Sequence, residues 1–226
     1  MKSAIKVDVL RHFPLFEGLS EETFIKLEGM AEHHSKAKQV QLYDTGEASD
    51  RVYFLLKGTV KTCTMSSDGR EVIKTILHPL AMFGELGLVG EKQRHESAFT
   101  MNEEVVYVTI SNANFQLLMR ANHRLCFNVL HLTGSRLLLA EAKLEALIFK
   151  DARSRIIDFL KDSANQRGRK VGYEMLFKHS LTQQDIANLT GTSRQTVTSV
   201  MNDLRKDNLI YFNRNTILIR DMGKLS

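Results

Sequence analysis

LTQQDIANLTGTSRQTVTSVMNDLRKDNLI, from Leu181 to Ile210, predicts two helices joined by a tight turn. Thr182, followed three residues later by Asp185, is typical of a helix that begins with a capping box. Gly191 can adopt the positive φ that ends the first helix, and Ser193 can cap the second. This order of caps, glycine and apolar positions predicts a helix-turn-helix.

Apolar and polar residues separate on the two predicted helices. The inward residues are Ile186, Ala187, Leu189, Val197, Val200, Met201 and Leu204. The exposed positions that a recognition helix offers to bases in the major groove are Arg194, Gln195, Thr198 and Ser199. The following NLIYFNRNTILIRD reads as a hairpin turning at residues 213–215, which adds a wing. A helical hairpin packed inside a domain is the alternative, and the polar exposed face opposes it.

Positive charge collects around this motif. Residues 1–150 contain 18 Lys and Arg against 18 Asp and Glu, whereas residues 151–226 contain 13 against 8, so the net charge of +5 lies in the last third. This surplus favours a polyanion, double-stranded DNA, as the partner. Phosphate contacts are expected from Thr182, Ser193, Thr196, Arg169, Lys170 and Arg214, and also from Arg167 and Lys178. Solvated surface charge is the alternative for the basic residues.

The chain upstream begins with short helices and continues as strands. Residues 9–34 read as helices, with Ser20 as a cap before Phe24, Leu27 and Ala31. Short runs rich in β-branched and aromatic residues then follow at 40–43, 51–56, 59–65, 71–77, 97–101 and 105–110. This spacing predicts an antiparallel barrel or roll, and an α+β fold for the whole chain.

After Ser111 the pattern becomes that of a long helix. Its apolar residues alternate at spacings of four and three, as in a coiled-coil seam: Cys126, Leu130, Thr133, Leu137, Ala140, Leu144 and Leu147. We expect a parallel homodimer, with a helix packed on its own barrel as the alternative. The predicted domains are an effector domain at 1–110, a dimerisation helix at 111–150 and a DNA-binding domain at 151–226.

Composition and motifs argue against other classes. No run approaches about 20 apolar residues and the N-terminus lacks a signal-like stretch, so we expect a cytoplasmic protein without a membrane partner. The two cysteines, Cys63 and Cys126, form no CxxC, and no metal site is expected. GxSxG, P-loop and HExxH motifs are missing, which argues against an enzyme.

Over nearly its full length the chain resembles the CRP/FNR family of bacterial transcription regulators. The resemblance rests on FPLFEGLSEE, DTGEASDRVYFLLKGTVK, SSDGREV, FGELGL, the long helix and the helix-turn-helix stretch. It implies an N-terminal cyclic-nucleotide-binding β-roll, a dimerising helix and a C-terminal winged helix-turn-helix, with a pseudo-palindromic operator and RNA polymerase as partners. Cyclic-AMP-dependent members carry an Arg-Glu pair and a second Arg on the recognition helix. Here Arg194, Gln195 and Ser199 match them, so Arg194 can read guanine while Gln195 favours adenine.

The resemblance also places an effector pocket, which departs from the cyclic-AMP pattern. Gly84, Glu85 and Leu86 preserve the Gly-Glu cradle, but Glu96-Ser97-Ala98 replaces the Arg-Ser-Ala that holds the phosphate. Ala140 and Glu141 stand where Thr-Ser would bind adenine, and Pro79-Leu80-Ala81 replaces the usual Pro-Gly-Asp. Arg136 on the long helix completes the residues assigned to the pocket.

These departures argue against ordinary control by cyclic AMP, and no cofactor is required. We expect an unidentified effector or a regulator that is competent without a ligand. One alternative is a nucleotide-responsive regulator in which Arg94 swings in to pair with the phosphate. A second, from another class, is a regulatory subunit acting on a protein partner, which would leave the helix-turn-helix unexplained. Iron–sulfur sensors of the family need a cluster of cysteines near the N-terminus, and residues 1–35 contain no cysteine. Haem sensors need axial ligands, for which His78 and the pair His123 and Cys126 are the candidates, but such residues are more typically structural or solvated.

Overall fold

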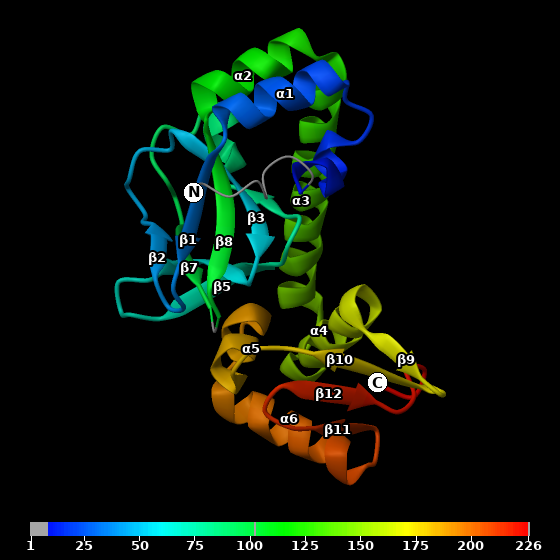
Figure 1. The fold of residues 1–226 in the computed structure, drawn as a ribbon. Coiled ribbons are helices and arrows are strands. Elements are labelled where there is room, and N and C mark those ends of the chain that lie inside the picture. Colours follow the sequence, from blue (N-terminus) through cyan, green and yellow to red (C-terminus); the bar gives the residue numbers. More distant parts are fainter. Residues whose placement is uncertain (1–8, 102, 226) are drawn as a thin grey trace. The chain divides into compact units, whose positions relative to one another are not determined.

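The computed structural model describes residues 9–101 and 103–225. The chain divides into two compact units, one of residues 1–65 and 74–139 and the other of 66–73 and 140–226. No helix in the described part of the chain is long and apolar enough to span a bilayer. The α+β fold, with an N-terminal roll, a long helix and a C-terminal helix-turn-helix, is confirmed (Figure 1).

The roll consists of two four-stranded sheets whose recorded pairings are antiparallel. The first has the order β1 (Glu32–Lys36), β8 (Val105–Ser111), β3 (Arg51–Lys57), β6 (Met82–Phe83). The second has the order β2 (Gln41–Tyr43), β7 (Ser97–Thr100), β4 (Val60–Met65), β5 (Glu71–Leu77). All six predicted strands are therefore confirmed.

The middle of β3 is an unbroken apolar run because both faces of this strand are buried. Successive side chains of a strand point to opposite faces. Val52 and Phe54 pack in a core shared with the N-terminal helices, whereas Tyr53 and Leu55 pack in a second core inside the roll. Both faces of the strand are thus covered, and each fully buried side chain contributes about 1.5–3 kcal/mol.

Helices of the N-terminal segment and of residues 85–149 accompany the roll. They are η1 (Leu10–His12), η2 (Pro14–Phe16), α1 (Glu21–Met30), η3 (Glu85–Val89), α2 (Asn112–Ala121) and α3 (His123–Phe149). The hydroxyl of Ser20 accepts the Thr23 N–H, as the sequence predicts for a cap. The prediction of helix through His34 is wrong, because residues from Glu32 onward form β1, which pairs with β8.

The single helix predicted from residue 111 is also wrong. It is broken at Asn122, whose backbone is extended and whose Oδ1 accepts the Leu125 N–H at 3.0 Å. The first backbone N–H groups of a helix have no partner within the helix, and the Asn122 side chain supplies one for the Leu125 N–H. Asn122 therefore separates α2, which lies beside α1 in Figure 1, from the long helix α3.

The second unit contains a four-stranded sheet and three further helices. The helices are α4 (Ala152–Arg167), α5 (Gln183–Thr190) and α6 (Arg194–Lys206), and the sheet order is β11 (Ile210–Phe212), β12 (Thr216–Ile219), β10 (Glu174–Lys178), β9 (Arg169–Val171). The predicted hairpin is confirmed as β11 and β12. Helix α4 continues to Arg167, and β9 begins after Gly168.

Candidate nucleic-acid interface and effector site

The turn between α5 and α6 is built as the sequence predicts. Thr182 Oγ1 accepts the Asp185 N–H at 3.1 Å, and the Asp185 carboxylate accepts the Thr182 N–H at 2.8 Å, which completes a capping box. Gly191 ends α5 with φ of 62°, and Ser193 Oγ accepts the Thr196 N–H at 3.0 Å at the start of α6. These bonds satisfy backbone groups that helix ends leave free.

An arginine that sequence reasoning missed holds the end of α5. Arg155 on α4 donates to the carbonyl oxygens of Thr190 at 2.8 Å and Gly191 at 3.0 Å. Its side chain thereby satisfies two carbonyls at the C-terminal end of the helix, where basic groups also complement the helix dipole. This contact joins α4 to α5. The three helices α4, α5 and α6 contact one another, and their buried residues are Ile156, Ile186, Ala187, Val197, Val200, Met201 and Leu204.

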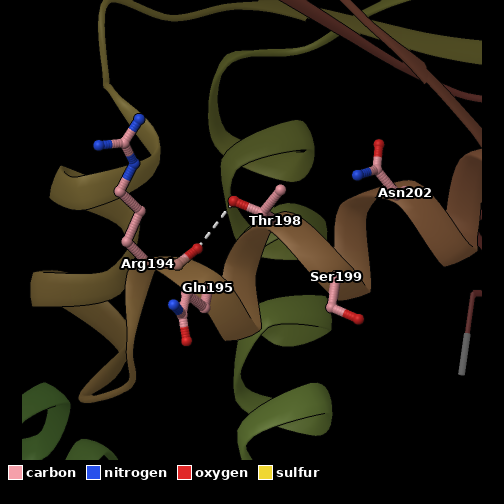
Figure 2. A pocket seen from close by; sticks show the side chains of 5 residues that line it. All are labelled: Arg194, Gln195, Thr198, Ser199 and Asn202. Carbon is pink, nitrogen blue, oxygen red and sulfur yellow. Dashed lines mark hydrogen bonds between the residues drawn. The ribbon is translucent and has the colours of Figure 1, made fainter.

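The outer face of α6 presents polar side chains around a shallow depression (Figure 2). It brings together all four residues predicted to contact bases: Arg194, Gln195, Thr198 and Ser199. Asn202 lines the same depression and was missed, although its position three residues after Ser199 places it on this face by helical periodicity. The face offers donors and acceptors that suit base edges in a major groove.

The residues predicted to contact phosphates lie in different places. Thr182 and Ser193 are the N-caps of α5 and α6, and the Thr196 hydroxyl lies 2.8 Å from Ser193 Oγ in the first turn of α6. Arg214 is exposed in the turn between β11 and β12. Arg169 and Lys170 are exposed on β9, at the edge of the sheet opposite β11, and α6 contacts β11.

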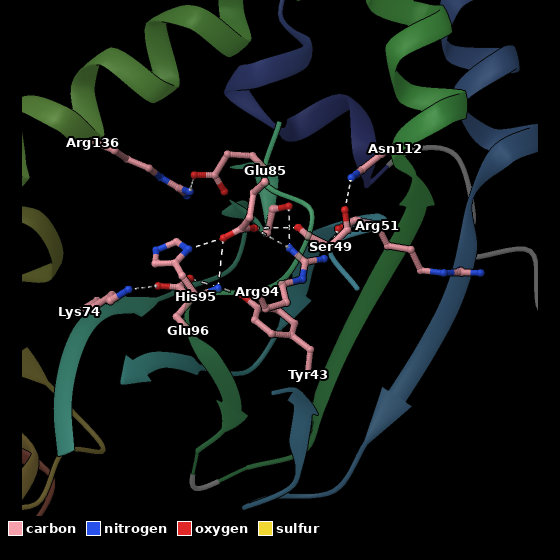
Figure 3. A network of polar contacts seen from close by, with 12 residues as sticks. Tyr43, Ser49, Arg51, Lys74, Glu85, Arg94, His95, Glu96, Asn112 and Arg136 are labelled. Carbon is pink, nitrogen blue, oxygen red and sulfur yellow. Dashed lines mark hydrogen bonds and ion pairs between the residues drawn. The ribbon is translucent and has the colours of Figure 1, made fainter. Parts of the chain in front are cut away.

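Figure 3 shows four of the residues assigned to an effector pocket: Glu85, Arg94 and Glu96 from the roll, and Arg136 from α3. Gly84, with φ of 70°, precedes η3, and Glu85 in η3 is buried. The Glu85 carboxylate forms an ion pair with Arg136 of α3, which also donates to the carbonyl oxygen of Met82. Glu85 therefore already has a cationic partner from the chain itself, while Leu86 lies partly exposed in the same turn.

Arg94 is part of the interior of the roll. Its side chain is 2% exposed, and its guanidinium donates to the carbonyl oxygens of Gly84 at 2.9 Å and Arg51 at 2.5 Å. The guanidinium carbon lies 4.5 Å from the ring centroid of Tyr43 and 5.6 Å from that of Tyr53. The cation is thus held by carbonyl oxygens and aromatic faces, and a Glu91 carboxylate oxygen lies 3.9 Å from one of its terminal nitrogens.

Glu96 and Ser97 are also engaged by neighbours. A Glu96 carboxylate oxygen lies 3.4 Å from Lys74 Nζ, and the Tyr43 hydroxyl is 3.4 Å from the other oxygen. Burial raises the pKa of Tyr43 above its ordinary value, and the Glu96 charge raises it further. Ser97 Oγ donates to the Asp44 carboxylate at 2.5 Å. Lys74 was missed because nothing in its strand pattern marks it as a partner of Glu96.

The predicted seam runs along α3 on a face that this chain leaves uncovered. Leu130, Leu137, Leu144 and Leu147 are 53–60% exposed, and Cys126 and Thr133 are partly exposed. Leu125 and Val129 on a neighbouring face are buried against the roll. Ala140 and Glu141 are exposed as well.

In the described residues no group of three or more His, Cys, Asp or Glu is placed to hold a metal ion.

Comparison with known proteins identifies both units. Residues 34–122 match the cyclic nucleotide-binding domain family, and residues 154–226 match the Crp-like helix-turn-helix domain family. The CRP-like cAMP-activated global transcriptional regulator of Mycobacterium tuberculosis (strain CDC 1551 / Oshkosh) is 28% identical over 219 residues, covering 97% of each chain. The global nitrogen regulator of Synechocystis sp. is 29% identical over 189 residues, covering 82% of this chain and 83% of the relative.

Among solved structures, a mutant of CooA from Carboxydothermus hydrogenoformans superposes with a TM-score of 0.77 at 25% identity, covering 92% of this chain and 90% of the other. The roll, the long helix and the helix-turn-helix define a DNA-binding transcription regulator with a cyclic-nucleotide-binding-like domain. The chain belongs to the CRP/FNR family.

Proposed function

We propose that this chain is a homodimeric, sequence-specific regulator that binds a pseudo-palindromic operator and does not depend on cyclic AMP. The proposal that the chain binds DNA is supported by the exposed face of α6. On this face one depression is lined by Arg194, Gln195, Thr198 and Ser199. Arg194 reads a G·C pair through the guanine edge, and Gln195 favours adenine. RNA polymerase is a further partner in this proposal.

Residues 151–226 form the DNA-binding domain in this proposal, with 1–110 as effector domain and 111–150 as dimerisation helix. Residues 1–8 of that effector domain lie outside the described residues. Contacts to phosphate come from Thr182, Ser193, Thr196 and the wing residue Arg214, and Arg169 and Lys170 contribute positive charge from β9. Such contacts supply affinity and salt dependence rather than sequence preference.

The proposal that cyclic AMP is not the effector is supported by one observation, the burial of Arg94. Both of its terminal nitrogens donate to backbone carbonyls, so using it as a phosphate partner would break one buried and one partly buried hydrogen bond. Glu96, at the position where cyclic-AMP-dependent members have an arginine, carries the same sign of charge as a phosphate and would repel it. Its ion-pair partner is Lys74. The arrangement favours an effector other than cyclic AMP, or none.

Isothermal titration of the full-length protein with cyclic AMP and cyclic GMP tests the effector claim. We expect no heat of binding at micromolar concentrations of either nucleotide. Saturable micromolar binding would overturn the claim and would favour the nucleotide-responsive alternative, since several relatives are named as cAMP-activated regulators.

A further inference from the structure

Thr198 is held by a residue that lies outside the recognition helix. Its Oγ1 donates to Gln183 Oε1 at 2.6 Å and lies 2.9 Å from the carbonyl oxygen of Arg194. Gln183 is the first residue of α5, on the other side of the turn. A threonine hydroxyl has one hydrogen, so this donor is already used within the protein. Figure 2 shows the hydroxyl directed back toward the Arg194 carbonyl.

What remains for a base is the methyl group and the acceptor lone pairs of the hydroxyl oxygen, and neither can donate a hydrogen bond. Thr198 lines the same depression as Arg194, Gln195 and Ser199, where base edges are expected. In the major groove the apolar partner of a threonine methyl is the C5-methyl of thymine. A Thr198 whose hydroxyl is tied back therefore suits thymine rather than a base that needs a hydrogen-bond donor.

We infer that Gln183 is a positioning residue that sets the base preference of Thr198. By accepting the hydroxyl proton, it holds Thr198 in the rotamer that offers its methyl group to a thymine. This inference rests on the proposed function, because it requires that α6 reads DNA. It adds a residue of the first helix to the determinants of sequence preference, without requiring that Gln183 touch a base.

The test begins with an operator selected by the full-length wild-type protein from a random library. Each dT of that operator is then replaced singly by dU, which removes only the C5-methyl. At one position in each half-site we expect the replacement to weaken binding about fourfold, since burial of one methyl contributes about 0.8 kcal/mol.

Two variants of Thr198 separate its methyl from its hydroxyl. Thr198→Ser lacks the methyl and is expected to bind the dT and dU operators equally. Thr198→Val keeps a methyl and is expected to retain the preference for dT at that position. If the wild-type protein shows no dU effect at any position while Thr198→Val changes the selected base, the hydroxyl reads the base and the inference is wrong.

Variants of Gln183 test the positioning role. Gln183→Ala is expected to lower the dT over dU ratio while binding stays specific, and Gln183→Glu, which keeps an acceptor oxygen, is expected to restore the ratio at lower affinity. Gln184→Ala is the matched control, because Gln184 bonds Asn188 on its own helix. An unchanged ratio in Gln183→Ala would overturn the inference. Failure of the wild-type protein to select any sequence would instead refute the proposed function.

Discussion

Arg94, a residue assigned to the effector pocket from the sequence, is buried and donates hydrogen bonds to two backbone carbonyls of the roll. The sequence places it two positions before Glu96, and from this spacing its direction could not be predicted. Its direction depends on Tyr43, Tyr53 and the carbonyl groups of Gly84 and Arg51, which come from other segments of the roll. Such long-range partners leave no local signal, whereas the caps of α5 and α6 involve neighbours in sequence and were predictable.

Replacement of Arg94 should therefore destabilise the roll. In Arg94→Met we expect the free energy of unfolding to fall by about 3 kcal/mol, because two backbone carbonyls lose their donor. Urea denaturation of the full chain measures this loss. Arg70→Met is the control: Arg70 is 84% exposed, and its loss should change stability by no more than about 0.5 kcal/mol. Equal effects of the two substitutions would contradict a structural role for Arg94.

His179 makes the second unit sensitive to acid. Burial lowers the pKa of His179, the hydrogen bond to the Leu181 carbonyl opposes this, and the Arg167 charge lowers it further. Because the unfolded chain binds the proton more readily, stability is fully present above the ordinary histidine pKa of about 6.5 and declines as pH falls through it. Unfolding measured between pH 8 and 5 should show this decline, and His179→Gln should flatten it. An identical pH dependence in the variant would refute the assignment.

At the scale of elements, two of the strands that the sequence missed are polar edge strands. β1 reads EHHSK and β9 reads RKV, and each lies at the edge of its sheet, where both can remain mostly exposed. Neither carries the apolar run or clean alternation by which a strand is recognised. The break between α2 and α3 was missed for another reason, since Asn122 interrupts a helical pattern that its neighbours continue.

Left-handed backbone at two turns predicts opposite effects of substitution. Gly191→Ala should destabilise the second unit by about 1 kcal/mol or more, because an L-residue is strained at φ of 62° and its Cβ would lie 2.8 Å from Leu147 Cδ2. Leu80, with φ of 72°, occupies such a conformation already, so Leu80→Gly should relieve about 1 kcal/mol in the roll. Denaturant titration distinguishes the two, and a loss of stability in Leu80→Gly would contradict the strain argument.

For the whole molecule, the exposed apolar seam of α3 predicts that two copies of the chain pair through this helix. The heptad spacing predicted the apolar stripe, and the structure leaves its leucines uncovered. Leu137→Glu should convert a dimer into a monomer at micromolar concentration in sedimentation equilibrium. Leu138→Glu is the matched control, because Leu138 is similarly exposed but lies outside the seam. A wild-type protein that sediments only as a monomer would refute the dimer.

We propose above that this regulator binds its operator without cyclic AMP. The proposal is tested most directly by measuring the affinity of the purified full-length protein for its selected operator, at fixed salt, with and without added cyclic AMP. We predict tight binding that is the same in both conditions and weakens steeply as salt increases, as expected for phosphate contacts. Specific binding that appears only when cyclic AMP is added would contradict the account.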